Sequence, residues 1–312
     1  MVATPFELTG ALTSIADGED FMEALVDAHP GWLTMQLWGA PSGPATRLGM
    51  FTVTCGTGPV GVTLIGSIHG EEPSGREACM AIARDLAETT DPTMLAYLAD
   101  YSVSIMSTAN PHGRANNIRF NANGEDLNRN YDTLDEPETV AIGAWMDWAE
   151  PVLTVDLHEM VASTPGVGDF QVSSGTMPDD GLAALLPLGD ELNALFGSAL
   201  VAAGYTWAEY PTISDGTIRR DGPPRWKAVV QLNETNRIRI PTLGGRIDAH
   251  RLVVDVSLEH HRLNAGEYEA AHVAAGGGTV PPPDAGRFIV RGGVAVPVVS
   301  SIVRGGVLVP LG

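Results

Sequence analysis

Two patterns of apolar residues alternate along the chain. Short runs rich in apolar and β-branched residues predict strands over 33–38, 50–55, 60–68, 102–106, 152–157, 206–209 and 228–233, and the run 60–68 is nearly all apolar, as in a strand buried on both faces. Apolar residues that recur every three to four positions predict helices over 20–28, 74–88, 92–99, 136–150, 182–203 and 246–261. This alternation favours an α/β fold, a three-layer αβα sandwich whose mixed sheet is mostly parallel. In such folds the chemistry lies outside the carboxyl ends of the strands.

Glycine and proline mark the connections. Gly56-Thr57-Gly58-Pro59 separates two apolar runs and predicts a hairpin between them. Polar loops are expected over 110–130 and from 158 to 179. Near the end of the chain, Arg-Gly-Gly-Val-x-Val-Pro begins at Arg291 and again at Arg304, which predicts a small C-terminal β appendage. We expect residues 1–274 to form the main domain, and residues 275–312 a linker and a β tail that is either a flap or an oligomerisation element.

Composition narrows the classes of function. The chain has 38 acidic and 18 basic side chains, a net charge of −20, which argues against binding nucleic acid through its phosphates. The N-terminus lacks the basic start of a signal peptide, and no apolar run reaches the roughly 18 residues of a membrane span. We therefore expect a soluble protein, cytoplasmic or, if a phage encodes it, virion-associated. Cys55 and Cys79 are expected to be buried free thiols, with one disulfide as the alternative.

Ionisable residues follow two of the apolar runs. The run 60–68 leads into His69-Gly70-Glu71-Glu72, and the run 152–157 leads into His158. Two histidines, one carboxylate and an open fourth position form the ligand set of many catalytic zinc sites. His69, Glu72 and His158 are therefore candidate ligands of one zinc ion, although His-x-x-Glu alone is a weak signal.

The polar loop between these histidines is rich in arginine and asparagine. It contains Arg114, Arg119 and Arg129, with Asn128 next to the last of them. Arginine offers bidentate hydrogen bonds to a carboxylate. This composition favours an anion-binding wall over an ordinary solvated surface.

Together these residues resemble the motifs of the zinc metallocarboxypeptidases, the carboxypeptidase A-like family, in its bacterial branch. The family has His-x-x-Glu, Asn-Pro-x-Gly, an arginine nine residues before the asparagine of Asp-x-Asn-Arg, a later histidine and a late glutamate. Here Asn110-Pro111-His112-Gly113 follows the first motif, and Arg119 lies 128 − 119 = 9 residues before Asn128. The resemblance covers about residues 21–261. It implies the family's fold, with one Zn²⁺ per chain held by His69, Glu72 and His158.

The resemblance also implies roles for the loop residues. Arg119 would polarise the scissile carbonyl and stabilise its oxyanion, and Asn128 with Arg129 would hold the terminal carboxylate of the substrate. Asp126 would orient the first zinc histidine, with Asp156 as the alternative residue for such a role.

A late carboxylate would act as the general base. Glu234 follows an apolar strand and is the preferred candidate, because Glu259 lies on an amphipathic helix where solvent exposure is the ordinary expectation. In the implied reaction, zinc lowers the pKa of a water, Glu234 takes its proton, and the proton then passes to the leaving amine.

The sequence departs from the family pattern in places. His112 replaces an aspartate, which we interpret as loop variation rather than a further ligand. No tyrosine clearly matches the residue that covers the substrate; Tyr210 is the candidate by spacing, with Tyr205 behind it. Arginines between 219 and 225 either meet an acidic substrate or face water. Surface or capping roles are expected for the remaining histidines, which are His29, His250, His260, His261 and His272.

Three functions are kept open. The first is a zinc metallopeptidase, a carboxypeptidase that hydrolyses the C-terminal bond of a peptide, including peptides of the cell wall. The second is a zinc amidohydrolase of the aspartoacylase or succinylglutamate desuccinylase type, acting on an N-acyl amino acid with a free carboxylate. The third is a structural protein of a phage virion or tail, with assembly contacts through the β tail. None of them involves nucleic acid or a membrane.

Overall fold

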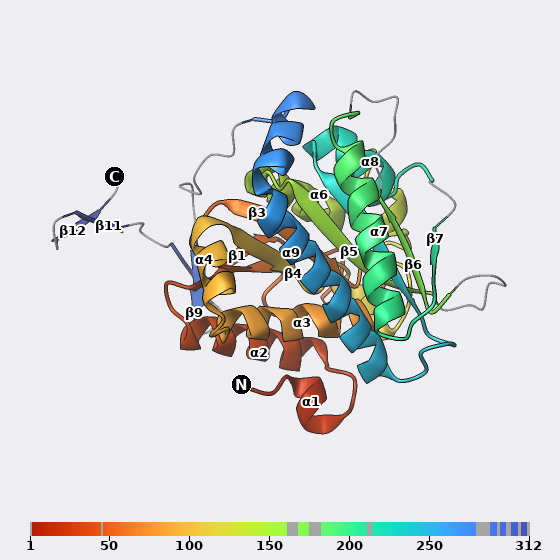
Figure 1. Ribbon diagram of the computed structural model, residues 1–312. Helices are drawn as coiled ribbons and strands as arrows, with labels where there is room; N and C mark the ends of the chain where they lie inside the picture. The colour runs from red at the N-terminus through yellow and green to blue at the C-terminus, as the bar shows by residue number, and fades with distance from the viewer. Residues whose placement is uncertain are drawn as a thin grey trace.

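A sheet of eight strands forms the centre of the molecule (Figure 1), in the order β1-β2-β4-β3-β5-β8-β6-β7. The computed structural model describes residues 2–44, 46–160, 168–174, 182–210 and 214–278, together with four short tail strands. The strands of the sheet are β1 (Leu33–Gly39), β2 (Met50–Cys55), β3 (Val60–Gly66), β4 (Ser102–Met106), β5 (Leu153–Met160), β6 (Phe170–Ser174), β7 (Trp207–Glu209) and β8 (Val229–Asn236). Strands β4, β3, β5 and β8 run parallel, while β1, β2 and β6 add antiparallel pairs. The expected mixed, mostly parallel sheet is confirmed.

Helices cover both faces of the sheet. They are α1 (Pro5–Thr9), α2 (Ile15–Ala28), α3 (Pro73–Ala87), α4 (Pro92–Asp100), α5 (Pro111–Asn116), α6 (Pro137–Ala149), α7 (Leu186–Ala202), α8 (Ile218–Trp226) and α9 (Leu243–Ala274), with a 3₁₀ turn η1 (Leu127–Arg129). None of the helices in the described ranges is long and apolar enough to cross a membrane.

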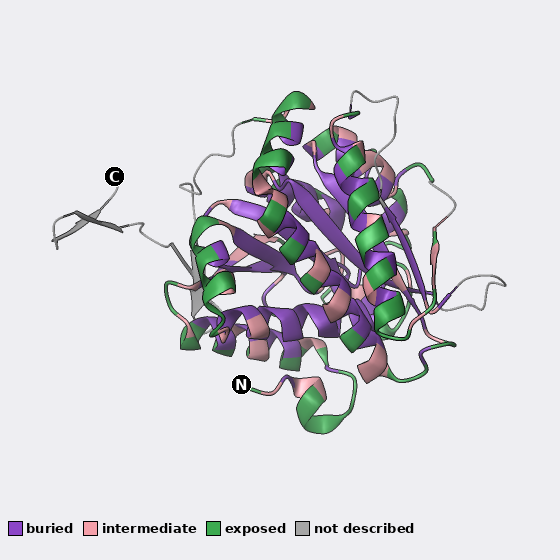
Figure 2. Cartoon of the chain, viewed as in Figure 1, coloured by how far each residue is buried: buried purple, intermediate pink, exposed green. Residues whose placement is uncertain are grey.

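Two hydrophobic cores make this a three-layer sandwich. Side chains of a strand alternate between its faces, so Val62 and Leu64 of β3 enter the core shared with α3, α7 and α9. Ile65 of the same strand enters the opposite core, which α6 and α8 cover. The central strands are therefore buried on both faces (Figure 2), as their apolar runs predict.

The hairpin expected around residues 56–59 is wrong. Strand β4 lies between β2 and β3 and pairs with both. The glycines instead allow a close approach to the end of α4: a Cβ at Gly58 would lie 2.1 Å from the Asp100 carbonyl oxygen. The Ser102 amide donates to the Pro59 carbonyl oxygen at 2.7 Å, which draws β4 into the gap.

Several boundaries also differ from the sequence predictions. Strands β5 and β8 continue through polar residues to Met160 and Asn236. Strand β6 lies in the segment 158–179, which is expected to be a loop, and α8 lies in a segment for which no element is predicted. Helix α9 extends thirteen residues beyond 261, to Ala274. Cys55 and Cys79 are buried free thiols, as expected.

The described residues of the tail include four short strands, as expected of a β appendage. Strand β9 (Phe288–Arg291) pairs antiparallel with β10 (Val294–Pro297), and β11 (Ser301–Arg304) with β12 (Val307–Pro310). The tail therefore has the β character that its repeated motif predicts, and the residues between the paired strands lie outside the described residues.

The histidines of α9 contradict the expected surface roles. His250, His260, His261 and His272 are each no more than 4% exposed. His261 packs against Tyr97, whose hydroxyl lies 2.8 Å from its Nδ1, and His260 Nδ1 lies 2.9 Å from the Tyr268 hydroxyl. Helical spacing places these residues on the inner face of α9, which a polar residue type alone does not reveal. His29, by contrast, follows the last turn of α2 as its C-cap.

Candidate metal centre and active site

The carboxyl ends of three parallel strands bring the main candidates together. His69 lies in the turn after β3, and Glu72 immediately precedes α3, which Pro73 begins. His158 and Glu234 lie on the adjacent strands β5 and β8, where they are direct partners in the parallel register. Residues separated by 165 positions in the sequence therefore meet at one edge of the sheet, where sites of α/β folds usually lie.

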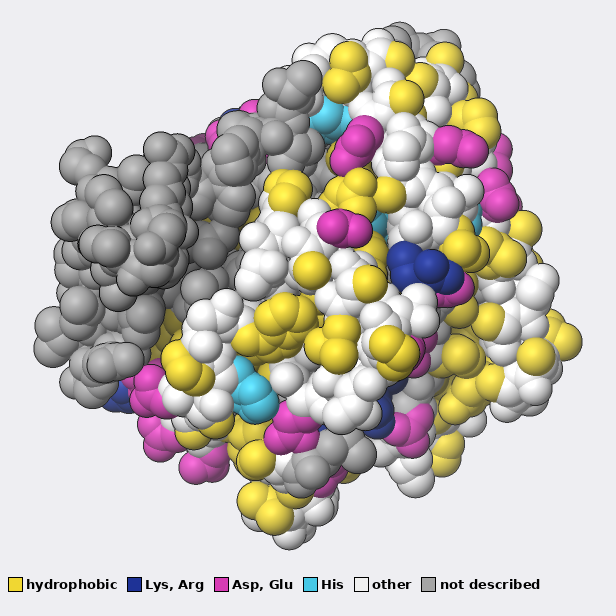
Figure 3. Space-filling view, turned by 60° about the vertical axis from the view of Figure 1, so that its left-hand side comes forward, with side chains coloured by type: hydrophobic (Ala, Val, Ile, Leu, Met, Phe, Trp, Pro, Cys, Tyr) yellow, Lys and Arg dark blue, Asp and Glu magenta, His cyan; other side chains and the backbone are white. Residues whose placement is uncertain are grey.

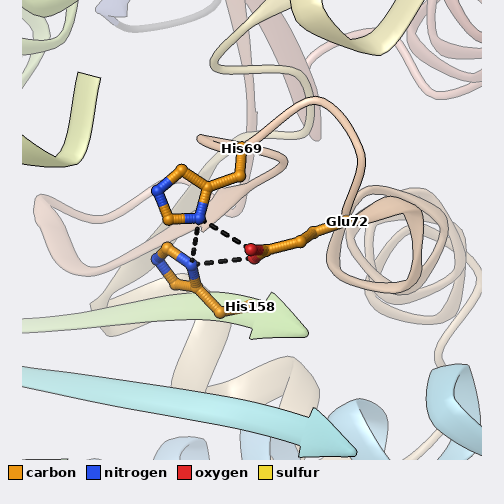
Figure 4. A group of neighbouring side chains, drawn as sticks. All are labelled: His69, Glu72 and His158. Carbon is orange, nitrogen blue, oxygen red and sulfur yellow. Dashed lines mark hydrogen bonds and ion pairs between the residues drawn. The ribbon is translucent and has the colours of Figure 1, made fainter. Parts of the chain in front are cut away.

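His69, Glu72 and His158 converge on one point (Figure 4). His69 Nδ1 lies 2.8 Å from Glu72 Oε1, His158 Nδ1 lies 2.9 Å from Glu72 Oε2, and the two Nδ1 atoms are 3.2 Å apart. The Glu159 amide donates to Glu72 Oε2 at 2.9 Å and helps to fix the carboxylate. All three side chains are buried, and their donor atoms lie within 4.8 Å of one another.

A carboxylate lies behind each imidazole. His69 Nε2 is 3.2 Å from Asp126 Oδ1, and His158 Nε2 is 2.7 Å from Asp156 Oδ2. Asp156 precedes His158 by two residues on β5, so both side chains point to the same face of the strand. Each Nε2 is therefore held as a donor, which leaves the Nδ1 lone pairs directed at a common point. Two such nitrogens and a carboxylate fit a zinc ion.

The charges of this group also suit a cation. Burial disfavours the imidazolium form, yet the neighbouring carboxylates outweigh it and raise the pKa of His69, through Glu72 and Asp126, and of His158, through Asp156 and Glu72. Burial would raise the pKa of Glu72, but the two histidines bring it well below its usual range. The cluster thus binds positive charge, which protons supply when no metal is present.

Arg119 lies beside the metal ligands. Its Nε and Nη2 each lie 2.9 Å from Asp126 Oδ2, and its Nη1 lies 3.2 Å from His69 Nδ1. Although burial opposes ionisation of Asp126, the bonds from His69 and Arg119 bring the pKa of this carboxyl well below its usual range. Asp126 therefore orients both a metal ligand and the arginine next to it.

Glu234 has an unusual environment for a carboxylate. Burial raises its pKa to about 7, with the histidines opposing the shift and Glu72 and Asp156 adding to it. A carboxyl group with a pKa near neutrality can accept and return a proton at physiological pH. The other late carboxylate, Glu259, instead lies on α9 and pairs with Arg262 at 2.7 Å.

A cavity of about 210 Å³ opens next to these residues. Its lining joins the metal ligands His69 and Glu72 to residues of the loop, of β5, of β8 and of α8: Arg119, Asn128, Arg129, Glu159, Met160, Tyr210, Ser214, Thr217, Arg219, Leu232 and Glu234. Asn128, Arg129 and Tyr210, expected to bind substrate, all line it, whereas Tyr205 packs against Phe170 instead.

The loop arginines do not all share one role. Arg114 is absent from the cavity wall; it is buried, and its guanidinium donates to the Gly70 carbonyl oxygen and to Asn117 Oδ1. The expectation that it belongs to an anion-binding wall is therefore wrong, because α5 directs it beneath the His69 turn. His112 lies on α5 with Nε2 near Asn116, outside the metal-ligand group.

Three cavity residues carry little signal in the sequence. Arg219 is the second residue of α8, a helix that contains Pro223 and Pro224 and that the apolar pattern does not predict. Met160 and Glu159 extend β5 past the apolar run, and Glu159 anchors Arg237 at 2.9 Å. A search for ionisable residues after each strand end would have found Glu159, whereas Arg219 depends on the path of the chain after β7.

Comparisons with known proteins agree with this geometry. Residues 19–164 match the sequence model of the zinc carboxypeptidase family. Carboxypeptidase SOL1 of Arabidopsis thaliana is 32% identical over 37% of this chain and 27% of its own length. Carboxypeptidase E of Caenorhabditis elegans is 29% identical over 38% of this chain and 36% of its own. The chain thus spans about a quarter to a third of the length of these relatives.

Solved structures share the fold over most of the chain. A metallo-carboxypeptidase from Burkholderia cenocepacia aligns with a TM-score of 0.64 at 18% identity, over 80% of this chain and 69% of that one. A metallo-carboxypeptidase from Pseudomonas aeruginosa, solved with (2-guanidinoethylmercapto)succinic acid, aligns with a TM-score of 0.63 at 16% identity, over 82% and 70%.

Fold, metal-ligand geometry and sequence therefore define the class. Residues 19–164, which contain His69, Glu72 and His158, match the zinc carboxypeptidase family, and the fold and the metal-ligand geometry agree with that match. Zinc is the metal of this family, and these three side chains are the group in the described residues that can hold it.

Proposed function

We propose that the protein is a zinc-dependent metallocarboxypeptidase that removes the C-terminal residue of a peptide. The observation that carries this proposal is one cavity that joins a His-Glu-His group to Glu234 on one side and to Arg129 and Asn128 on the other. Hydrolysis of a bond one residue from a free carboxylate needs a metal site and a carboxylate-binding group in the same cavity.

In this proposal Asn128 and Arg129 hold the terminal carboxylate. Asn128 Oδ1 accepts from the Ile218 amide at 3.1 Å, which leaves its Nδ2 hydrogens directed away from that bond and available to a ligand. Arg129 donates to the Asn128 carbonyl oxygen at 2.5 Å and has no ion pair to a carboxylate of the described residues. A substrate carboxylate would supply that partner in a bidentate geometry.

The chemistry at the scissile bond falls to two side chains. A bound zinc ion lowers the pKa of a coordinated water and polarises a carbonyl group. Glu234 takes the proton of the attacking water at its carboxylate and delivers it to the leaving amine. Arg119, fixed by Asp126, donates to the oxygen on which negative charge develops, an arrangement for which one donor is typically worth ~10²–10³ in kcat. Tyr210 would close over the bound residue.

Mass spectrometry of peptide products tests the proposal. Peptides with a free C-terminus are expected to lose one residue at that end, and the same peptides with an amidated C-terminus are expected to stay intact. Glu234→Gln should lower kcat by about 10²–10⁴ while the protein keeps its zinc. Equal cleavage of free and amidated peptides would contradict a carboxypeptidase.

We further propose residues 1–274 as the catalytic unit and 275–312 as an accessory tail, because α9 ends at Ala274. The substrate class is a peptide with a free carboxylate. The relatives and structures named above lend no support to action on cell-wall peptides, to an amidohydrolase acting on N-acyl amino acids, or to a virion component. An oligomer contact through the tail stays a prediction.

A further inference from the structure

Arg219 is a buried arginine in the wall of the active-site cavity. Its side chain lines the cavity, and the residue is only 2% exposed. It is the second residue of α8, whose N-cap is Thr217. Its position in the wall therefore follows from where α8 begins.

No carboxylate of the described residues forms an ion pair with Arg219. Its printed partners are the Tyr210 carbonyl oxygen, 3.4 Å from Nη1, and the Tyr210 ring, whose centroid lies 5.0 Å from Cζ. Among the other buried arginines, Arg76 pairs with Glu77 at 3.4 Å and Arg246 with Glu159 at 3.3 Å, whereas Arg114 donates to the Gly70 carbonyl oxygen and to Asn117 Oδ1, away from the cavity. Of the arginines that line the cavity, Arg119 pairs with Asp126, whereas Arg129 and Arg219 have no carboxylate partner among the described residues.

A buried charge without a counter-ion is costly. Burial accordingly lowers the pKa of Arg219, with Tyr210, Glu234 and Glu209 opposing the shift. The aromatic ring covers one face of the guanidinium, and apart from the long bond from Nη1 to the Tyr210 carbonyl oxygen its N–H groups have no acceptor among the described residues. An anionic group of a ligand is the natural partner for these N–H groups.

Arg219 is held close to the residues that would bind the terminal carboxylate. The Ile218 amide donates to Asn128 Oδ1 at 3.1 Å, and the Tyr131 amide donates to the Gly216 carbonyl oxygen at 2.9 Å. A Cβ at Gly216 would lie 2.4 Å from the Arg129 carbonyl oxygen, so the two segments are in direct contact. One small ligand can therefore place one carboxylate on Arg129 and a second on Arg219.

We propose that Arg219 receives the side-chain carboxylate of the residue to be released, so that the preferred substrates are peptides that end in glutamate or aspartate. This inference rests on the proposed function. Apolar atoms of Met160 and Leu232, which also line the cavity, would contact the methylene groups of that side chain.

The inference is tested by comparing two peptides that are identical except for the last residue, which is glutamate in one and glutamine in the other. These two side chains differ in charge and hardly in shape. For the zinc-loaded protein, kcat/KM is expected to be about 10- to 100-fold higher for the glutamate peptide, the range of a hydrogen bond between charged groups. Arg219→Gln should remove this preference, so that kcat/KM becomes similar for the two peptides.

Two matched variants serve as controls. Arg220→Gln changes the next residue, which pairs with Asp215 at 2.7 Å outside the cavity wall, and should alter neither substrate. Arg129→Gln should weaken both substrates equally. Equal loss on both substrates in Arg219→Gln, or no glutamate preference in the wild type, would overturn the inference.

Calorimetry with free L-glutamate and L-glutamine gives a readout without turnover. Glutamate is expected to bind more tightly to the wild type, and Arg219→Lys should retain part of that difference. Cleavage of glutamine peptides without a glutamate preference contradicts the inference alone. If no peptide with a free C-terminus is cleaved, the proposed function fails, and equal binding of the two amino acids would then reject the inference as well.

Discussion

The aspartates behind the two histidines decide how firmly the metal ligands are held. Asp156→Asn should lower zinc affinity about 10- to 100-fold, because an amide cannot hold His158 Nε2 as firmly in its donor state. The direct contact is 2.7 Å long and fully buried. Competition with a chromogenic chelator measures this affinity. Asp20→Asn, on the exposed face of α2, is the control, and an unchanged affinity in Asp156→Asn would contradict the orienting role.

His261 should make the folded state sensitive to acid. Burial and His260 lower its pKa to about 4, while an unfolded histidine titrates near 6.5. Because the folded pKa is lower, the unfolded chain takes up the proton first, and stability is lost as pH falls from about 6.5 to 4. In urea unfolding, His261→Asn should flatten this slope, since Asn can still accept from the Tyr97 hydroxyl. An unaltered slope would assign the acid sensitivity to other groups.

At the scale of elements, the turn between β3 and α3 leaves no room for a side chain. A Cβ at Gly70 would lie 1.9 Å from the Gly113 carbonyl carbon of α5. Gly70→Ala should therefore shift the turn that carries His69 and reduce both stability and zinc affinity. Gly266→Ala is the control, because nothing lies within 4 Å of its Cβ in α9 and helix propensity predicts a gain of about 0.5–1 kcal/mol. Thermal unfolding compares the two.

The sequence predicts the elements better than their pairing and their ends. Apolar runs identify β3, β4 and β5, yet they do not reveal that β4 lies between β2 and β3, since strand order depends on contacts distant in the chain. Strand β5 continues to Met160 because its backbone pairs with β8 through His158 and Glu159, where side-chain polarity predicts an end. The segment around β6 has too short an apolar run to be distinguished from the loops that flank it.

The residues of the active-site cavity also differ in how well the sequence predicts them. Motif spacing identifies His69, Glu72, His158 and Arg119, because catalytic chemistry restricts residue type and separation. Motif spacing does not distinguish Arg114 from Arg119 and Arg129, because all three lie in one polar loop. Only the turn of α5 directs Arg114 away from the cavity. Motif spacing also leaves Arg219 ambiguous, because burial without a counter-charge is a property of the folded chain.

At the scale of the whole molecule, the net charge of −20 is compatible with a cavity whose wall contains three arginines, Arg119, Arg129 and Arg219. Figure 3 shows a face on which acidic side chains lie dispersed among apolar ones and basic side chains are sparse. Arg129 and Arg219 in the cavity form no ion pair with a carboxylate of the described residues. Ten other arginines do form ion pairs: Arg47, Arg76, Arg84, Arg119, Arg220, Arg237, Arg239, Arg246, Arg251 and Arg262. Local cations can thus attract a carboxylate in an acidic molecule.

The division of the chain gives a prediction at the same scale. A variant that ends at Gly278 should retain zinc and the kcat of the full chain, because the residues that line the cavity and hold the metal all precede α9. Peptide cleavage and zinc content of the two forms measure this. Loss of zinc on truncation would show that the catalytic unit includes the tail.

Zinc content by elemental analysis tests the central claim most directly. The wild-type chain should contain one zinc ion, His69→Ala and His158→Ala should lose it, and Glu234→Gln should keep it while losing peptidase activity. Unchanged zinc in the two histidine variants would contradict the metal site and, with it, the proposed chemistry.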